Sequence, residues 1–463
     1  MNKYIIVGII LVALVALLAT NKKLVETLKN IYKIEELRKR ILFTLGLLLI
    51  YRLGSFVTLP GIDHGALEAF TQSFADKGEN AGNLMGLLNI FSGGAFSQAS
   101  IFALGVMPYI TASIIIQLLG IMVPYFRKMQ REGESGRRKM NQWTRFLTIA
   151  VLILQGPAYL YSQVLSWGAV SPACSGDLLG IANGQFVIPA VVILIAGTMF
   201  IMWLGEKITD KGIGNGISLI IMIGIVARLP QAFMQEFNLQ VLGDGSIIMF
   251  IVELIFLALV FMLAIAIVQA VRRIPVQYAK RIVGNKQYGG VRQYIPLKLN
   301  AANVMPIIFA QALMFIPGLI WKNSAAWTDI TSFWYNFTLV VLVVAFTYFY
   351  TAIIVNPQMM ADDMKRNGGF IPGVKPGKST VKYIDDVMTR ITLPGSIFLA
   401  LITVLPAIAM TLGISQGFAY FFGGTSLLIM VGVVLDTLKQ IESYLLMRHY
   451  DGLMKTGRIQ GRY

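Results

Sequence analysis

Long apolar stretches separated by polar loops dominate the chain. A helix needs about 20 residues to cross the roughly 30 Å hydrocarbon core of a bilayer. Most of the stretches reach that length, while Asn215–Leu229 is short and would need flanking residues or a tilted neighbour. The pattern predicts an all-α polytopic membrane protein. The predicted spans are Met1–Thr20, Ile41–Leu59, Ala99–Val123, Phe146–Ser166, Phe186–Gly205, Asn215–Leu229, Ile247–Val271, Asn303–Trp321, Phe333–Val355, Ile391–Leu412 and Phe422–Met447.

Basic residues are concentrated in every second loop. By the positive-inside rule these loops are cytoplasmic, and with the spans above every loop then falls on a consistent side. The intervening loops Trp167–Gln185, Pro230–Ser246 and Gly413–Phe421 contain no lysine or arginine, and Lys322 is alone in its loop. The basic segments are Tyr125–Gln142, Arg272–Asn300, Asn356–Arg390 and the tail after Met447.

The composition agrees with a membrane protein and argues against several other classes. The 463 residues are 56% hydrophobic and 13% charged, whereas a soluble domain carries about 25% charged residues. The net charge of +16 would suggest nucleic acid in a soluble protein, but here its position in the loops matters more. Cys174 is the only cysteine, and His64 and His449 lie outside the spans. We therefore expect no disulfide, no metal centre and no cofactor.

The first 40 residues predict two different elements. Met1–Thr20 lacks a clear small-residue cleavage site, which favours a retained membrane anchor over a signal peptide. Lys22–Arg40 places leucine and isoleucine near one helical face and lysine and arginine around the remainder. That pattern is typical of a helix lying on the cytoplasmic leaflet. Met1–Thr20 would then run from outside to inside.

A short apolar piece, Leu84–Ser92, follows a polar external stretch and runs into Gly93–Gly94. It is too short to span and predicts a re-entrant element. Irregular backbone at membrane depth is tolerated only where protein or a water-filled cavity surrounds it. The sequence therefore implies a cavity.

Two large cytoplasmic loops, Arg272–Asn300 and Asn356–Arg390, interrupt the second half of the chain. In the first, Val276–Tyr278 and Gln293–Leu297 could pair as strands. Such loops are natural docking surfaces, and the alternative is a solvated basic loop near anionic lipid.

Two glycine-rich motifs do not support nucleotide binding. Gly373–Ser379 resembles a phosphate-binding loop but has three residues between its glycines instead of four. In Gly212–Gly216 the third glycine comes too early for a dinucleotide fingerprint, so we expect a tight cytoplasmic turn that opens the next helix. Any ATP hydrolysis must therefore come from a partner, and the chain itself is not expected to be an enzyme.

Charged residues inside the spans are few and scattered. Arg52, Glu253 and Asp436 lie in three different segments, which favours structural or snorkelling roles over a catalytic pair. An ion-coupled secondary transporter of small solutes is the competing function, but it would need paired broken helices. The spans that could line a cavity are aliphatic instead, although ordinary helix packing explains any single position. These positions are Val106, Ile110, Ile217, Ile221, Ile308 and Ile429.

From Lys23 to its C-terminus the chain resembles the SecY family, the central subunits of the bacterial protein-conducting channel. Many long segments carry the resemblance in the same order. They are Arg52–Phe56 with Pro60–Asp63, NIFSGGAFSQASIFALGVMPYITASIIIQLL at Asn89–Leu119, EGESGRRK at Glu132–Lys139, Gly197–Ile221, Tyr278–Arg281, Ile295–Asn300, FIPGVKPGKST at Phe370–Thr380, Lys382–Gly395 and FGGTSLLI at Phe422–Ile429.

The resemblance implies a ten-helix channel in two pseudo-symmetric halves, with a plug and a lateral gate. The gate would lie between about Ala99–Leu119 and Asn303–Trp321, with Phe146–Tyr161 and Phe333–Tyr350 beside them. The six aliphatic positions named above would form the narrow pore ring, where Val106 is one methylene shorter than the common isoleucine. The plug would consist of Leu84, Met85, Leu87, Leu88, Ile90, Phe91 and Ser92.

The resemblance also implies partners. They are the SecE and SecG subunits, the SecA motor ATPase, the ribosome, unfolded preproteins with their signal peptides, and membrane lipids, with no nucleic-acid specificity. Lys375 stands where the family commonly has arginine, and lysine lacks the planar fork for bidentate contacts. Asn285–Lys286 likewise replaces a frequent arginine pair. The implied docking residues for the motor or the ribosome are Arg273, Lys280, Arg281, Lys286, Lys375 and Lys378.

Together these interpretations predict a multi-pass protein of the bacterial inner membrane with a cytoplasmic C-terminus. Met1–Thr20 departs from the family, and its origin as a native span, a fusion or a partner's helix stays open. The predicted divisions are an extra helix at 1–21, an amphipathic helix at 22–40, an N-terminal half at 41–230, a C-terminal half at 231–447 and a tail at 448–463.

Overall fold

The computed structural model describes residues 34–67, 89, 92–168, 170–171, 176–178, 183–242, 247–278, 281–283, 286–288, 292–314 and 329–456. Three predictions lie wholly or mostly outside these residues: the N-terminal span Met1–Thr20, the amphipathic segment up to residue 33, and the plug except Ser92. Within the described residues the chain forms two compact units.

The first unit contains α3 (Glu35–Gly54) except its last residue, the end of α9 (Gly184–Lys211), the start of α10 (Gly216–Phe237) and most of α19 (Gly424–Thr456). Glu35 and Glu36 lie in the first turn of α3, where carboxylates interact favourably with the helix dipole. They also pair with Lys39 at 2.8 Å and Arg40 at 3.2 Å. The predicted boundary between residues 40 and 41 therefore falls inside one continuous helix.

Glycines make the turn between α9 and α10. A Cβ on Gly216 would collide with the carbonyl oxygen of Gly205, and Gly214 has a φ of +83°, which favours glycine. Gln440 Oε1 accepts a hydrogen bond from the Gly214 N–H at 2.8 Å. The predicted tight turn is confirmed. The span predicted at Asn215–Leu229 needs flanking residues to cross a bilayer, and α10 provides them by continuing through Pro230 to Phe237.

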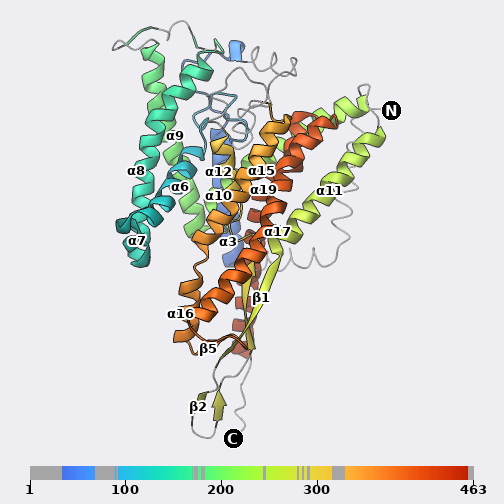
Figure 1. Cartoon of the computed structure of the whole chain (residues 1–463). Coiled ribbons are helices and arrows are strands. Elements are labelled where there is room, and N and C mark those ends of the chain that lie inside the picture. The colour runs from blue at the N-terminus through green and yellow to red at the C-terminus, as the bar shows by residue number, and fades with distance from the viewer. Residues whose placement is uncertain are drawn as a thin grey trace. The chain divides into compact units, whose positions relative to one another are not determined.

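The second unit holds most of the described helices. They are α6 (Met107–Met122), α7 (Pro124–Arg131), α8 (Glu134–Tyr159) with a π-helical end (Leu160–Val164), α11 (Ile247–Gln269), α12 (Met305–Leu313), α15 (Phe333–Ile354), α17 (Lys378–Thr411) and the remainder of α9, α10 and α19. Helix α6 packs against α8, α12 against α15, and α15 against α17 (Figure 1).

Among the described residues, seven helices are long and apolar enough to cross a membrane, or eight if the bent pair α6 and α7 counts as one span. The seven comprise α8, α9, α10, α11, α15, α17 and α19. This establishes a multi-pass membrane protein. The ten spans and the eleventh at the N-terminus include residues outside the described ranges, so those totals stay predictions.

A small antiparallel sheet occupies the predicted cytoplasmic loops. Strand β1 (Val271–Tyr278) lies between β4 (Arg292–Lys298) and β5 (Gly369–Phe370), and Ile274 faces Ile295 in the register. Alternate residues Ile274 and Val276 are buried, as period-2 patterning requires. The predicted strand pairing is confirmed. A second hairpin joins β2 (Arg281–Val283) to β3 (Lys286–Tyr288).

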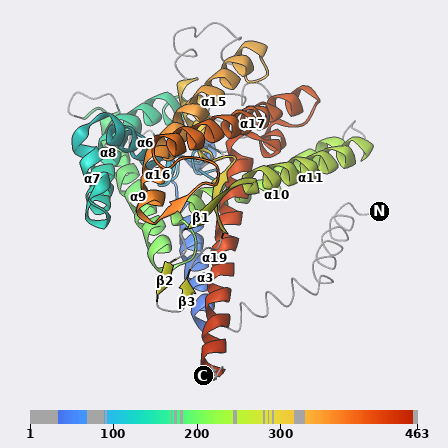
Figure 2. The same ribbon diagram turned by 60° about the horizontal axis from the view of Figure 1, so that its bottom comes forward.

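Helix α16 (Pro357–Arg366) and the start of α17 cover this sheet (Figure 2). The Asn356 side chain caps α16 by accepting from the N–H groups of Gln358 and Met359. One apolar core joins strands and helices, and we name these elements the cytoplasmic module after their predicted side of the membrane. Its buried residues are Ile274, Val276, Leu297, Met364, Ile371, Ile384 and Met388.

The predicted start of the gate helix at Ala99 is wrong. Residues 99–106 form turns, and α6 begins at Met107 with Pro108 in its first turn. The backbone of this stretch pairs elsewhere: the Ala99 carbonyl accepts from the Leu59 N–H, and the Ile101 N–H donates to the Val57 carbonyl, each at 2.9 Å. Hydropathy could not reveal this difference, because the stretch is as apolar as the helix that follows.

Candidate functional site

An apolar cavity of about 690 Å³ lies inside the second unit. One side is formed by α6 and α8, and the other by α12 with single residues of α10 and α19. The lining residues are Ser92, Phe96, Ala103, Leu104, Gly105, Val106, Met107, Ile110, Thr111, Ile114, Ile115, Leu118, Gln155, Ala158, Tyr159, Ser162, Gln163, Ile221, Ile308, Phe309, Gln311 and Ile429.

Five of the six predicted ring positions meet at this cavity. Val106 is the N-cap of α6 and Ile110 lies in its first turn. The others come from α10, α12 and α19, and are Ile221, Ile308 and Ile429. The sixth residue, Ile217, belongs to the first unit, where it packs against Gly205. The role of these residues as a pore ring stays a prediction.

The few polar groups of the lining come mainly from α8, which contributes Gln155, Ser162 and Gln163. Gln163 Oε1 is buried without a hydrogen-bond partner. On the α12 side, Gln311 Oε1 accepts from the Thr425 hydroxyl at 3.4 Å. The aliphatic remainder offers an ion no replacement for its hydration shell.

Only one predicted plug residue, Ser92, is among the described residues, and it lines the cavity. Its hydroxyl donates to the Asn89 carbonyl at 3.3 Å and accepts from the Phe96 N–H at 3.1 Å. The Asn89 side-chain oxygen in turn accepts from the Ser97 N–H at 3.2 Å. These bonds give the stretch that begins at Ser92, the last predicted plug residue, a defined conformation. We name residues 92–98 the return segment.

Tyr159 of α8 holds the return segment from the side of the predicted gate. Its hydroxyl donates to the Phe96 carbonyl at 2.8 Å, and the two rings lie 4.8 Å apart. Both side chains are buried. This contact links the return segment directly to the cavity wall.

Sequence reasoning missed Arg228 of α10, which also contacts the return segment. Its guanidinium donates to the Ser97 hydroxyl at 3.4 Å and lies against Gly94, where an added Cβ would be 2.9 Å from Nη2. Arg228 lies one residue before the predicted end of its span at Leu229, a position typical of a charge that flanks the membrane. Because α10 continues to Phe237, Arg228 instead lies inside the helix.

The intramembrane charges predicted to be structural do not form a catalytic centre. Glu253 is buried, and Gln240 Nε2 donates both to it and to Glu236 of α10, each at 3.2 Å. Glu236 also accepts from the Ser415 N–H at 2.8 Å, so this polar cluster braces α10, α11 and the loop before α18 (Gln416–Ala419). Arg52 and Asp436 lie on α3 and α19. Within the described residues, no group of three or more His, Cys, Asp or Glu could hold a metal.

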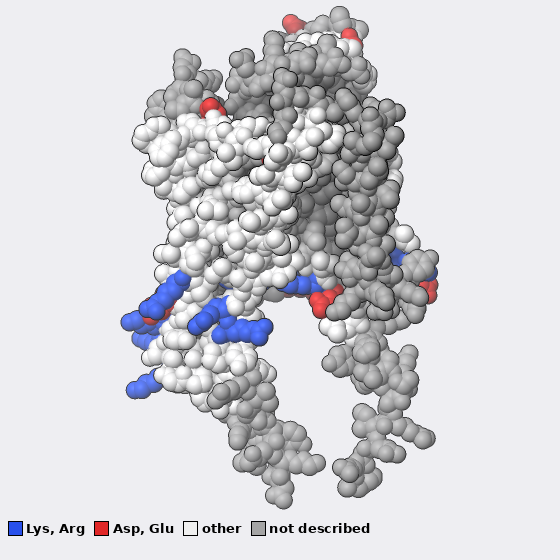
Figure 3. All heavy atoms as spheres, turned by 90° about the vertical axis from the view of Figure 1, so that its right-hand side faces the viewer, with Lys and Arg blue, Asp and Glu red and all other residues white. Residues whose placement is uncertain are grey.

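The predicted docking residues lie on the cytoplasmic module where they are described. Arg273 is exposed on β1 opposite Pro296, and Lys375 and Lys378 are exposed before and at the start of α17. Arg281 and Lys286 belong to β2 and β3, and Lys280 lies outside the described residues. In Figure 3, lysine and arginine gather at the lower left of the view, below a surface of uncharged residues.

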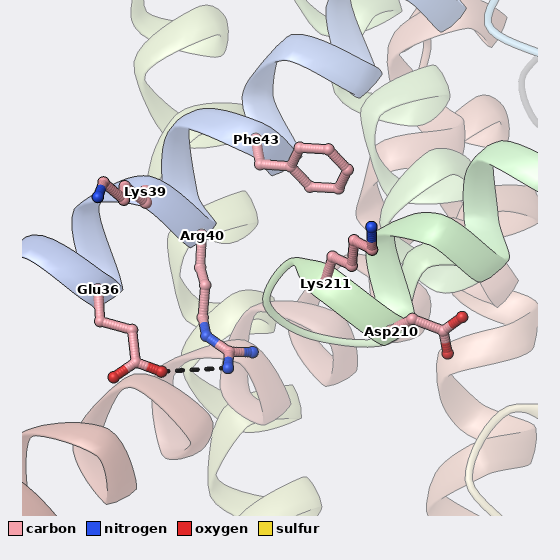
Figure 4. Close-up of a pocket in the computed structure, with 6 residues that line it drawn as sticks. All are labelled: Glu36, Lys39, Arg40, Phe43, Asp210 and Lys211. Carbon is pink, nitrogen blue, oxygen red and sulfur yellow. Dashed lines mark hydrogen bonds and ion pairs between the residues drawn. The ribbon is translucent and has the colours of Figure 1, made fainter.

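A second hollow, of about 400 Å³, belongs to the first unit. Its lining mixes both signs of charge around Phe43, and Arg40 reaches Glu36 at 3.2 Å (Figure 4). The remaining lining residues are Lys39, Asp210 and Lys211. Because exposed ion pairs of this kind contribute little, the hollow does not compete with the apolar cavity as a functional site.

Several membrane-length helices, and an aliphatic cavity with an irregular segment at its edge, define a channel-type membrane protein. The SecY family model matches residues 100–438, and the chain belongs to the SecY family. It is 44% identical over 449 residues to the protein translocase subunit SecY of Streptomyces scabiei, covering 92% of this chain and 98% of that protein. The subunit of the same name from Mycobacterium bovis is 41% identical over 438 residues, covering 91% and 97%.

Solved structures share the fold. The structure of a protein conducting channel aligns with a TM-score of 0.60 at 17% identity, covering 87% of this chain and 91% of that chain. Sec61 in the canine ribosome–channel complex aligns with a TM-score of 0.57 at 16% identity and the same coverage. At these identities the likeness concerns the fold alone. The SecY-type channel fold predicted from the sequence is thereby confirmed.

Proposed function

We propose that this chain is the pore-forming subunit of a Sec translocon in the bacterial inner membrane. It passes unfolded preproteins across the membrane and releases hydrophobic segments sideways into the lipid. The observation that carries this proposal is the meeting of five aliphatic ring positions at one apolar cavity. Family membership and relatives named as protein translocase subunits support it.

The aliphatic lining suits a channel that must pass many sequences. A narrow collar without donors or acceptors dewets and resists ions when no polypeptide is present. The same collar cannot bind one particular peptide side chain, so it does not select among precursor sequences. Resistance to ions and tolerance of sequence therefore come from one property.

The arrangement of helix pairs supports a lateral exit. Helices α6 and α8 pack together on one side of the cavity, and α12 packs on α15 at the other. Separation of the two pairs would expose a translocating segment to lipid. Segments rich in Leu, Ile, Phe and Val would then leave into the bilayer, whereas Asp, Lys or Arg would oppose exit.

The cytoplasmic module is the proposed docking surface for a driving partner. The energy for transport would come from the SecA ATPase or from the ribosome, with SecE and SecG completing the complex. A ribosome complex is known for the Sec61 channel of similar fold. The exposed cations Arg273, Lys375 and Lys378 suit an acidic or phosphate-bearing partner, and the C-terminus would lie on the same, cytoplasmic side.

Reconstitution tests the proposal directly. The chain, assembled with SecE and SecG in vesicles, is supplied with SecA, ATP and a precursor carrying a signal sequence. We expect ATP-dependent protection of the precursor from external protease, and no protection of the same precursor without its signal. An inert complex with intact partners, combined with ion-driven uptake of a small solute, would instead establish the transporter alternative.

A further inference from the structure

The return segment carries features that a simple connection does not need. Gly94 has a φ of +96°, its N–H donates to the Asn89 carbonyl at 2.9 Å, and its own carbonyl accepts from the Ser97 hydroxyl at 3.1 Å. The segment lines the cavity through Ser92 and Phe96. Any displacement of the segment therefore changes the wall of the cavity.

Arg228 reaches this segment from the element that also supplies a ring residue. It follows Ile221 on α10 by seven residues, which is about two helical turns, so both side chains lie near one face of the helix. Its Nη2 lies 3.4 Å from the Ser97 hydroxyl, and the space that a Cβ of Gly94 would need is filled by Nη2 and Nε. A planar guanidinium can lie flat against a glycine and still donate at its edge, which an ammonium group cannot do.

We propose that Arg228 is a positioning residue that latches the return segment in the resting channel and so sets the threshold for its opening. The proposal rests on the function proposed above. Together with Tyr159 on α8, Arg228 holds the segment from two different helices. An ionised side chain within a membrane span is costly and is retained where it has a function. Because the segment lines the cavity, a precursor that passes through the cavity would displace it, and the strength of the latch would set how effective a signal sequence must be.

The test compares Arg228→Ala, Arg228→Lys and Ser97→Ala in the complete complex. Three readouts are used: ion conductance of the resting complex, labelling of Gln98→Cys by an impermeant maleimide in a Cys174→Ser chain, and transport of precursors with intact or weakened signals. For Arg228→Ala we expect about a tenfold rise in conductance and labelling, the size that corresponds to losing one charge-assisted hydrogen bond. Weak-signal precursors should gain most, and intact ones should change little.

The other variants separate latching from mere stability. Arg228→Lys should restore part of the seal, since charge is kept and the flat contact is lost. Ser97→Ala should show a smaller rise. Added to Arg228→Ala it should raise the conductance by less than it does alone, because the contact between the two side chains is already gone and only the bond from the Ser97 hydroxyl to the Gly94 carbonyl remains to be lost. Val226→Ala, at an exposed position of the same helix, should behave as the parent protein.

Two results would overturn the latch. One is an Arg228→Ala complex with unchanged conductance and labelling. The other is an equal loss of transport for all precursors together with a lower melting temperature, which would make Arg228 purely structural. If the parent complex transports no precursor, the proposed function fails, but conductance and labelling still report on Arg228 by themselves.

Discussion

Single side chains set the polarity of the cavity wall. Ile429 lies at the start of α19, is 8% exposed and faces the cavity together with Ile221 and Ile308. Most of the cavity lining around it is apolar. A side chain of similar volume that can bind water would therefore change the hydration of the cavity without changing its packing much.

We predict that Ile429→Asn raises the ion conductance of the resting complex by about tenfold, since an amide in an apolar site recruits water to avoid a penalty of about 1–3 kcal/mol. The matched control is Ile429→Leu, which keeps the volume and the apolar character. The measurement is single-channel recording in a planar bilayer. Equal conductance of the two variants would show that side-chain polarity at this position does not control the seal.

Single residues of the site could be predicted where the hydrophobic spans and the family resemblance indicated the same positions. The aliphatic positions were identified from the spans and the family resemblance, and five of them line one cavity. Arg228 lies next to the predicted end of its span at Leu229, and Glu236 lies beyond that end, so neither was expected inside a helix that continues to Phe237. Glu236 and Gln240 are four residues apart, a local spacing, but the contacts of Arg228 with Ser97 and of Glu236 with the Ser415 N–H join distant parts of the chain, which no local pattern specifies.

At the scale of elements, close backbone contact fixes the connection between α9 and α10. Gly216 approaches the Gly205 carbonyl so closely that a Cβ would have to displace backbone. Backbone cannot yield as the end of a flexible side chain can. The contact therefore specifies glycine independently of helix propensity, which alone would favour alanine.

Gly216→Ala is accordingly expected to lower the free energy of unfolding by about 1–3 kcal/mol. Gly46→Ala on α3 is the control, because nothing lies within 4 Å of the added Cβ and the substitution should raise helix stability slightly. Thermal unfolding of the purified protein in detergent would measure both. A variant at residue 216 as stable as the parent would mean that the two helices can separate at little cost.

Helix centres could be predicted from hydropathy, but helix ends could not. Helix α17 begins at Lys378, 13 residues before the predicted start at Ile391, because its first turns pack on the cytoplasmic module and do not enter lipid. Strand β1 includes Val271, which hydropathy assigned to the preceding span. In both cases the ends are determined by tertiary partners, which the local composition does not reveal.

At the scale of the molecule, the proposed transport would require that force from a driving partner reaches the cavity. The cytoplasmic module is joined to the channel helices through α17, which contributes Ile384 and Met388 to the module's core before entering the apolar region. Force applied to the module thus acts on a helix that packs against α15, the neighbour of α12. The module's exposed cations are then the place where a partner's binding should be most sensitive to charge.

Charge reversal at Arg273 and Lys375 together should slow motor-driven transport by about tenfold, a value within the range that electrostatic steering of association covers. The loss should be smaller at 1 M salt for an assay of motor binding, because the Debye length there falls to about 3 Å.

Lys382→Glu is the matched control: it makes the same change at an exposed position of the same module, within the first turns of α17 where a carboxylate suits the helix dipole. If Lys382→Glu slows transport as much as Arg273→Glu or Lys375→Glu does alone, the partner responds to the total charge of the module and not to these two side chains. If the double variant unfolds at a lower temperature in proportion to its lost transport, Arg273 and Lys375 stabilise the module and the docking role is wrong.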